Sequence, residues 1–437
     1  MDTLLLSRLQ FALNISFHIL WPSISIGLSW LLFFFKIKYR KTNDHSWMKE
    51  YQFWVKIFAL CFALGVVTGV TMSFQFGTNW PGFMETVGNI AGPLLGYEVL
   101  TAFFLEASFL GIMLYGREKV SEKIHTLSTF LVAFGTTLSA FWIIALNSWM
   151  QTPLGHVMKD GKAYAQNWLQ IVFNYSTGYR FTHVIIASFL TALFLVAGIN
   201  ACRIKNNAFS RSAKLSLRFC IYLALLFSPI QILVGDLHGL VTLKHQPAKV
   251  AAMEGIWETE KSSPLRLFAI PDSVNKKNHY EVNIPYLASL ILTHSFDGEI
   301  KGLNEFKDDI PPVKPVFFGF RIMVGIGMIM LFLSFWGGLI FFKNRKIFDT
   351  FKFSPYFLKS MIVMTFSGWL ATLAGWYTTE VGRQPWLVQG ILKTKDSVAK
   401  NLDAQHVLFT LILYGVVYAF LMFAFLWTIK YLMKREQ

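Results

Sequence analysis

The sequence Gly-Trp-Tyr-Thr-Thr-Glu-Val-Gly-Arg-Gln-Pro-Trp occupies residues 375–386 and closes an apolar run that begins near residue 360. It places a carboxylate, Glu380, and a guanidinium, Arg383, where that run would leave a lipid bilayer. A charge near the hydrocarbon of a membrane is costly unless it is paired or bound to a ligand. An ion pair in this position therefore indicates a functional site within a membrane protein.

The rest of the chain is apolar enough to lie in a membrane. Hydrophobic residues make up 54% of the 437 positions, Phe alone occurs 43 times, and only 15% of the residues are charged. A helix needs about 20 mostly apolar residues to cross roughly 30 Å of hydrocarbon. Nine runs reach that length: 11–35, 53–76, 93–115, 126–149, 180–201, 216–238, 317–342, 360–380 and 405–429. The sequence therefore predicts an all-α polytopic membrane protein with about nine transmembrane helices, forming a single membrane domain over 1–437.

The basic residues indicate how the chain crosses the membrane. A net charge of +15 would suit nucleic acid, but more than half of the 40 lysines and arginines fall in segments that share one side of the membrane. These segments are 36–56, 117–123, 203–218, 343–359 and the tail from 430. By the positive-inside rule that side is cytoplasmic. We therefore expect a multi-pass protein of the bacterial inner membrane, without a nucleic-acid partner. Its N-terminus is periplasmic, its C-terminus is cytoplasmic, and the large outer loop between spans six and seven covers 239–315.

The sequence contains no motif for a cysteine-bound metal or for nucleotide hydrolysis. Cys61, Cys202 and Cys220 lie in or beside the spans without metal-type spacing, and we interpret them as structural thiols. A glycine-rich phosphate loop is absent, which argues against a pump driven by nucleotide hydrolysis.

Histidines inside the spans indicate metal or haem ligation. His18, His183 and His238 fall within apolar runs, whereas His125 and His406 lie at span ends, where we expect solvated imidazoles. A buried imidazole needs either a hydrogen-bond partner on a neighbouring helix or an iron atom. Met323 and Glu380, two further residues that can bind iron, are expected near the same outer side of the membrane as His18 and His183.

Arg321 makes the interpretation of Met323 more specific. A methionine alone is usually core filler. An arginine two residues earlier, inside an apolar run, needs an anion, and a haem propionate would supply one. The alternative is that Arg321 reaches out to the aqueous interface.

Span three contains two carboxylates, Glu98 and Glu106. Eight residues of α-helix separate them by about 12 Å along the axis and by about 80° around it. Neither has a counter-ion in the same helix, which suits acids that carry protons. The alternative is that both are structural hydrogen-bonding acids.

The start of the outer loop, from Ala248, has the pattern of a short helix. Lys249 and Glu254 flank its apolar strip, and Trp257 follows. Such a segment is able to offer a cation and a carboxylate to an amphipathic ring at the interface. On spacing alone, however, a solvated helix face is favoured.

Taken together, these residues resemble subunit I of the cytochrome bd-type quinol oxidases, and the resemblance runs along essentially the whole chain. The motifs that carry it are His18, Gln75-Phe-Gly-Thr-Asn-Trp80, Glu98, Ala102-Phe-Phe-Leu-Glu106, Asn147-Ser-Trp-Met-Gln151, Arg180-Phe-Thr-His183, Gln246-Pro-Ala-Lys-Val-Ala-Ala-Met-Glu254, Phe320-Arg-Ile-Met323 and 375–386.

The resemblance implies roles for these residues. His183 and Met323 would be the axial ligands of a low-spin haem b. Glu380 would bind a high-spin haem b, and His18 would bind the third haem, where oxygen is reduced. Arg321 and Arg383 would neutralise haem propionates or the Glu380 site, and Trp376 would pack among the haems. Glu98 and Glu106 would conduct protons. Lys249 and Glu254 would belong to the quinol site.

The resemblance also implies a mechanism and partners. Quinol, either ubiquinol or menaquinol, would be oxidised near the outer face, and O2 would be reduced to water with cytoplasmic protons. A proton-motive force would thus arise without pumping. A second oxidase subunit and a small accessory subunit would complete the enzyme.

Two features place the chain within that family. Its outer loop resembles the short quinol-loop form, and the residues after Trp80 resemble the cyanide-insensitive branch. In that branch the third haem is b rather than d, so the expected cofactors are two haem b and either one haem d or a third haem b.

Three other functions compete with the oxidase as explanations of the sequence. A cofactor-free proton-coupled transporter leaves Met323 beside Arg321 unexplained. A membrane electron-transfer cytochrome b without oxygen chemistry uses only His183 and Met323. A purely structural partner subunit uses none of these residues.

Overall fold

The computed structural model describes residues 2–208, 210–307, 309–345, 348 and 350–435. Within these residues nine helical segments are long and apolar enough to cross a membrane, which confirms the predicted number. They are α1 (Thr3–Thr42), α2 (His45–Thr78), α3 to α4 (Pro81–Tyr115), α5 (Glu122–Gln151), α7 (Thr177–Asn206), α8 (Arg211–His245), α11 (Val313–Lys343), α12 to α13 (Pro355–Val381) and α14 (Ala404–Arg435). Each is longer than the apolar run that predicted it, because the polar flanking turns continue the helix.

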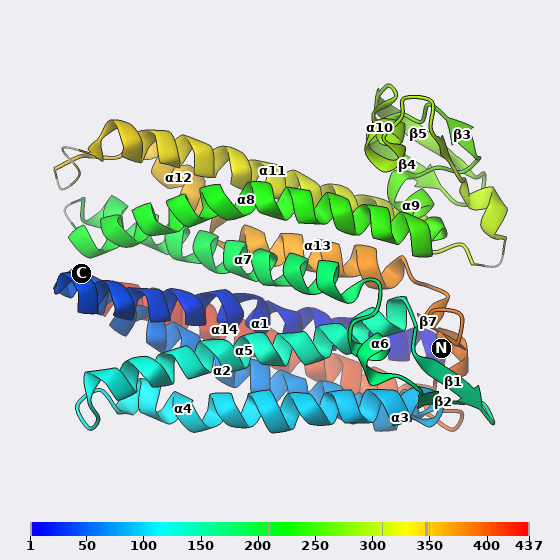
Figure 1. The fold of residues 1–437 in the computed structure, drawn as a ribbon, viewed down its shortest axis with the longest axis horizontal. Helices are drawn as coiled ribbons and strands as arrows, with labels where there is room; N and C mark the ends of the chain where they lie inside the picture. Colours follow the sequence, from blue (N-terminus) through cyan, green and yellow to red (C-terminus); the bar gives the residue numbers. More distant parts are fainter. Residues whose placement is uncertain (1, 209, 308, 346–347, 349, 436–437) are drawn as a thin grey trace.

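The helices lie roughly side by side, with α1 in the interior (Figure 1). Two thirds of the apolar window of α1 is buried, and it packs against α2, α5, α7 and α14. Aromatic rings fill these contacts. Trp21 of α1 meets Trp369 of α13 and Phe425 of α14 edge to face, with centroids 5.7 and 5.0 Å apart.

The chain termini lie at opposite ends of the molecule (Figure 1). The N-terminus shares its end with the large segment between α8 and α11, and the C-terminus lies at the other end, with the basic turns. This arrangement follows from an odd number of spans. The assignment of the N-terminal end to the periplasm rests on charge and stays a prediction.

Irregular and short elements gather at the N-terminal end. Within the predicted outer loop 239–315, α8 continues to His245 and α11 begins at Val313, so the segment that joins these helices covers 246–312. Its elements are α9 (Pro247–Glu254), β3 (Glu260–Lys261), β4 (Leu265–Asp272), β5 (Lys277–Ile284), α10 (Leu287–Thr293), β6 (Glu299–Ile300) and η2 (Leu303–Phe306). Outside that loop lie β1 (His156–Lys159), β2 (Lys162–Ala165), α6 (Trp168–Val172), β7 (Trp386–Val388), β8 (Leu392–Lys393) and η5 (Thr394–Asp396). The strands pair antiparallel as β1–β2, β3–β6, β4–β5 and β7–β8, and none of them crosses the bundle.

Two spans change helix type part-way. Span three runs as α3 (Pro81–Glu98), a π-helical turn η1 (Val99–Phe103) and α4 (Phe104–Tyr115). Span eight runs as α12 (Pro355–Val363), a 3-10 turn η4 (Met364–Phe366) and α13 (Ser367–Val381).

The π-turn corrects the predicted 80° offset between Glu98 and Glu106. A π-turn holds roughly one residue more than an α-turn, so the eight residue steps from Glu98 to Glu106 cover only about two turns. Both glutamates consequently face α5. Glu98 accepts a hydrogen bond from Ser139 at 2.7 Å, and the side chain of Glu106 packs on Gly135, one turn away along α5.

His125 is another correction. It was expected to be solvated at a span end, but it is buried and stacks edge to face with Tyr51, with centroids 5.8 Å apart. Its Nε2 lies 3.2 Å from the carbonyl oxygen of Met113. The reason is that α2 and α5 begin before their apolar runs and, together with the end of α4, enclose the imidazole. His406, by contrast, keeps 84% of its side chain exposed.

A buried ion pair fastens α2 to α7 near the basic end. Nη1 of Arg203 donates to Glu50 Oε1 at 2.7 Å, and Nδ2 of Asn200 and Nε1 of Trp54 donate to Glu50 Oε2 at 3.3 and 3.1 Å. The Glu50 side chain is fully enclosed, and that of Arg203 is 9% exposed. Removing one partner of such a pair leaves an uncompensated charge.

We therefore expect Glu50→Ala to lower the free energy of unfolding by about 3–5 kcal/mol. The measurement is the melting temperature of the purified complex. The matched control is Lys301→Ala, because Lys301 pairs with Glu305 at 3.7 Å on the surface, where the two side chains are 63% and 37% exposed. Exposed pairs contribute about 0–1 kcal/mol, so equal melting temperatures for the two variants would contradict this account of the buried pair.

Candidate functional site

His18 is held by a defined hydrogen bond. Its Nδ1 lies 2.9 Å from Thr68 Oγ1, and that hydroxyl already donates to the carbonyl oxygen of Leu64 at 2.7 Å. The hydroxyl must therefore accept from the imidazole, so Nδ1 carries the proton and Nε2 keeps its lone pair. The ring also faces Gly69, where a Cβ would come within 3.3 Å of it. His18 is thus oriented as a metal-binding imidazole.

His183 and Met323 also face glycines. A Cβ at Gly235 of α8 would lie 3.5 Å from His183 Nε2, and a Cβ at Gly375 of α13 would lie 2.7 Å from Met323 Sδ. The second distance is too short for any larger residue unless the thioether moves. Both side chains remain partly exposed although they lie within spans. A second imidazole, His238, lies with its centroid 5.9 Å from that of His183.

Glu380 lies at the end of α13 and is held from two sides. Its Oε1 accepts hydrogen bonds from Asn147 Nδ2 at 2.9 Å and from Gln151 Nε2 at 3.0 Å, both on α5. Its Oε2 pairs with Arg383 Nη2, as the sequence predicted. The side chain keeps 17% of its surface exposed, whereas Arg383 keeps 3%, so one side of the carboxylate is open.

Lys249 and Glu254 are buried, which corrects the expectation of a solvated helix face. Lys249 is 3% exposed and Glu254 5%, because α9 packs against α8 and α11. The Lys249 ammonium donates to Gln151 Oε1 and to Gln246 Oε1, each at 2.7 Å. Burial, aided by the charge of Arg180, lowers the pKa of Lys249 well below its usual range, although Glu380 opposes this shift.

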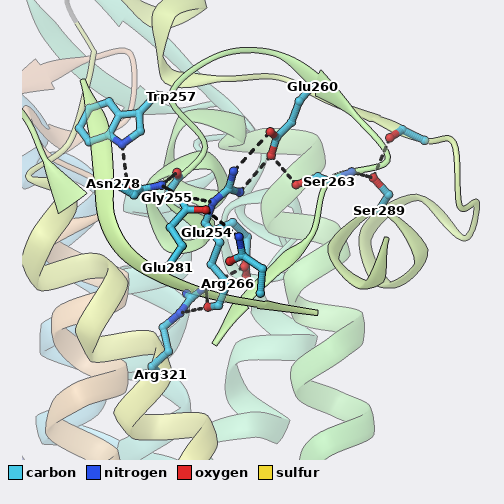
Figure 2. Close-up of polar contacts among 12 residues, drawn as sticks. Glu254, Gly255, Trp257, Glu260, Ser263, Arg266, Asn278, Glu281, Ser289 and Arg321 are labelled. Atoms are coloured by element: carbon cyan, nitrogen blue, oxygen red, sulfur yellow. Dashed lines mark hydrogen bonds and ion pairs between the residues drawn. The ribbon is translucent and has the colours of Figure 1, made fainter. Parts of the chain in front are cut away.

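Arg321 pairs with a carboxylate of the outer loop, and its predicted role beside a haem propionate stays a prediction. Figure 2 shows its guanidinium below the outer loop, where Nη2 pairs with Glu254 Oε2 at 2.9 Å. It also donates to the carbonyl oxygens of Met253 and Arg266. Because Arg321 lies two residues before Met323, the helix that carries this thioether is fastened directly to the loop.

The loop itself is braced by a second arginine (Figure 2). Arg266 pairs with Glu260 at 3.0 Å and with Glu281 at 3.3 Å. Burial alone would lower the pKa of Arg266, but these two carboxylates outweigh it and raise the pKa. Asn278 accepts from Trp257 Nε1 at 2.9 Å and donates to the carbonyl oxygen of Gly255 at 2.9 Å. The β4–β5 hairpin therefore holds the end of α9 in place.

A cleft opens beside these residues at the N-terminal end of the molecule. It encloses about 410 Å³ of space open to solvent, and its lining includes Gln246, Lys249, Arg383 and Trp386. Within the described part of the chain, Nε and Nη1 of Arg383 and Nε1 of Trp386 are buried without a hydrogen-bond partner. These donors would suit a ligand that presents acceptor oxygens.

The comparisons with known proteins agree with this geometry. The family described as cytochrome bd terminal oxidase subunit I matches residues 6–437. This chain belongs to that family.

The relatives match over nearly their whole length. Subunit 1 of the cytochrome bd ubiquinol oxidase of Bacillus subtilis (strain 168) is 36% identical, covering 98% of this chain and 94% of its own. Subunit 1 of the cytochrome bd-II ubiquinol oxidase of Escherichia coli (strain K12) is 31% identical, covering 97% and 95%. The solved bd oxidase of Geobacillus thermodenitrificans has a TM-score of 0.91 and 29% identity, covering 100% of this chain and 99% of its own.

As a cytochrome bd subunit I, the chain requires haem, and its residues fit that group. Imidazole, thioether and carboxylate are all side chains that bind haem iron. Glycines opposite His18, His183 and Met323 let these three side chains pack closely against a neighbouring helix. Buried donors without partners among the described residues, at Arg383 and at His238 Nε2, are groups that a bound cofactor or water would satisfy.

Several residues of the cytochrome bd site had no assigned role in the sequence. Asn147 and Gln151 bind Glu380, and Nη1 of the buried Arg180 donates to Asn147 Oδ1 at 3.4 Å. The sequence did contain a pattern that could have indicated them, namely two amides four residues apart near the outer end of span four. Trp376 lies one turn before Glu380 on α13 and is half-buried, and its packing among the haems stays a prediction.

Proposed function

We propose that this chain carries the haems and the quinol site of a cytochrome bd-type quinol:oxygen oxidoreductase. Supporting this, three iron-binding side chains on three different helices each face a glycine, and a fourth, Glu380, is held open on one side. His183 and Met323 would hold a low-spin haem b, Glu380 a high-spin haem b, and His18 the haem of the oxygen site. When bound, these groups supply the one-electron steps and the metal at which O2 is reduced.

The chain's own residues would bind quinol and take its protons at the outer loop. Lys249 offers a buried ammonium to a quinol oxygen, and Glu254 offers a carboxylate that is able to accept a proton. Two quinols release four electrons and four protons at this face. The quinol is ubiquinol or menaquinol, and a subunit II with a small accessory subunit would complete the complex.

Protons for oxygen reduction would come from the opposite, cytoplasmic side. Glu106 is buried, and its Oε1 has no partner among the described residues. Glu98, on the same helix face, is hydrogen-bonded to Ser139. Such a pair suits stepwise proton transfer toward the oxygen site. Four protons taken up inside and four released outside would generate a proton-motive force without pumping.

A dithionite-reduced minus oxidised spectrum of the purified complex, with haem extraction, tests the proposal. We expect haem bands from low-spin and high-spin centres. Extraction of b-type haem alone would support three haem b, as in the cyanide-insensitive branch, and a chlorin band in the red would indicate haem d at His18. A complex without haem bands would contradict the oxidase and favour a cofactor-free transporter. A single low-spin haem b would favour an electron-transfer cytochrome.

A further inference from the structure

One amide connects the outer loop to the Glu380 site. Gln151 Oε1 accepts from Lys249 Nζ at 2.7 Å, and Gln151 Nε2 donates to Glu380 Oε1 at 3.0 Å. The amide is itself buried, with 1% exposure. Lys249 lines the cleft, whereas Gln151 does not, so the amide lies behind the lysine as seen from the opening.

The orientation of this amide is fixed on both sides. An ammonium only donates hydrogen bonds, so it must face the amide oxygen, and an ionised carboxylate only accepts, so it must face the amide nitrogen. If the amide were rotated by 180°, its NH2 group would face the Lys249 ammonium, a second donor, and its oxygen would face the Glu380 carboxylate, a second acceptor. Lys249 therefore determines which group Gln151 presents to Glu380.

Hydrogen bonds in a buried chain polarise one another. A cation on the amide oxygen strengthens the amide N–H as a donor, so the Lys249 bond strengthens the Gln151 bond to Glu380. If Lys249 moves to a ligand in the cleft, the amide loses its cation. The carboxylate then keeps more negative charge for any metal that it binds.

We infer that Gln151 is a positioning residue that couples Lys249 in the cleft to the carboxylate of Glu380. The inference rests on the proposed role of Glu380 as an iron ligand. Occupation of the cleft by quinol would thereby be sensed at the high-spin haem, through Lys249 and one amide and without movement of a helix.

The test compares Gln151→Ala and Lys249→Met in the purified complex. We expect both to change the EPR line shape and the optical band of the high-spin haem, and to leave the low-spin bands in place. The double variant should show no larger change than Gln151→Ala alone, because the two residues act in series. Additive changes, or a high-spin haem that responds to neither substitution, would overturn the inference.

Two further variants separate coupling from general damage. Gln10→Ala removes another buried amide, which bonds Thr410 and Asn79 and has no described contact with Lys249 or Glu380, so the high-spin spectrum should stay unchanged. Gln151→Glu keeps an acceptor for Lys249 but removes the donor to Glu380, and it should shift the high-spin haem at least as much as Gln151→Ala. If Gln10→Ala moved the signal equally, or Gln151→Glu restored it, a specific role for the amide would be excluded.

Kinetics supply an independent readout. Lys249→Met should raise the KM for quinol, because Lys249 lines the cleft, whereas Gln151→Ala should lower kcat with little change in KM. Failure of the proposed function looks different from failure of this inference. If Glu380→Ala leaves the high-spin haem intact, the ligand assignment is wrong; if it removes that haem but Gln151→Ala has no effect, only the coupling is wrong.

Discussion

Replacement of Glu380 by alanine is expected to remove the high-spin haem signal and to leave the low-spin signal in place. The carboxylate is the proposed iron ligand at this site, and among the described residues its hydrogen bonds reach only Asn147, Gln151 and Arg383. His183 and Met323 lie on other helices and keep their facing glycines in the variant. Quinol oxidase turnover should be lost as well, because electrons would no longer reach the oxygen site. The measurements are the difference spectrum and the EPR spectrum of the purified complex.

Two comparisons make this result specific. Glu380→Gln keeps the shape of the side chain but removes its charge, so it should lose the high-spin haem at least in part. Glu299→Ala removes an exposed carboxylate of the outer loop and should leave all haem bands unchanged. Equal loss of the low-spin and high-spin signals in Glu380→Ala would indicate misfolding and would count against the ligand assignment.

Glu106→Gln is expected to reduce oxygen consumption by roughly 100-fold or more while haem content stays normal. The amide has the size of the carboxyl group but does not release a proton. The side chain at this position packs closely on Gly135. Electrons would still enter from quinol, so the haems should be reduced at a normal rate and then wait for protons. Stopped-flow reduction and an oxygen electrode measure the two steps separately.

The control for this variant is Glu118→Gln, which alters an exposed carboxylate in the turn between α4 and α5. Its oxygen consumption should equal that of the unaltered complex. Slow haem reduction in Glu106→Gln would place the defect at the quinol side instead and would remove Glu106 from the proton route.

The nine spans were predictable because each needs only a long apolar run, and such runs are a property of consecutive residues. The residue types of the site were predictable for a related reason. A histidine, a glutamate or an arginine within a span is costly, so its presence alone indicates a partner. The Glu380–Arg383 pair is the clearest case, because the two residues lie three apart, one in the last turn of α13 and one just after it.

Other features depend on contacts between distant segments and had no local signal. Lys249 was expected to face solvent, but it is buried because Gln151 and Gln246 accept its hydrogen bonds. The pairing of Arg321 with Glu254 was not predicted, because it forms only when the outer loop folds back onto α11. The π-turn at 99–103 was missed for another reason, since a shift of the backbone hydrogen bonds leaves no mark on residue type.

That π-turn lets span three hold one residue more than an ordinary helix would need between its two carboxylates. Seven α-helical steps of about 100° bring two side chains back to nearly the same face, whereas Glu98 and Glu106 are separated by eight steps. If Val99–Phe103 relaxed into an α-helix without losing a residue, one glutamate would turn by about 80° relative to the other. A related span that is one residue shorter here would therefore keep both carboxylates toward α5 as a plain α-helix, so a graft or a chimera joined within this span must match the helix type to the residue count.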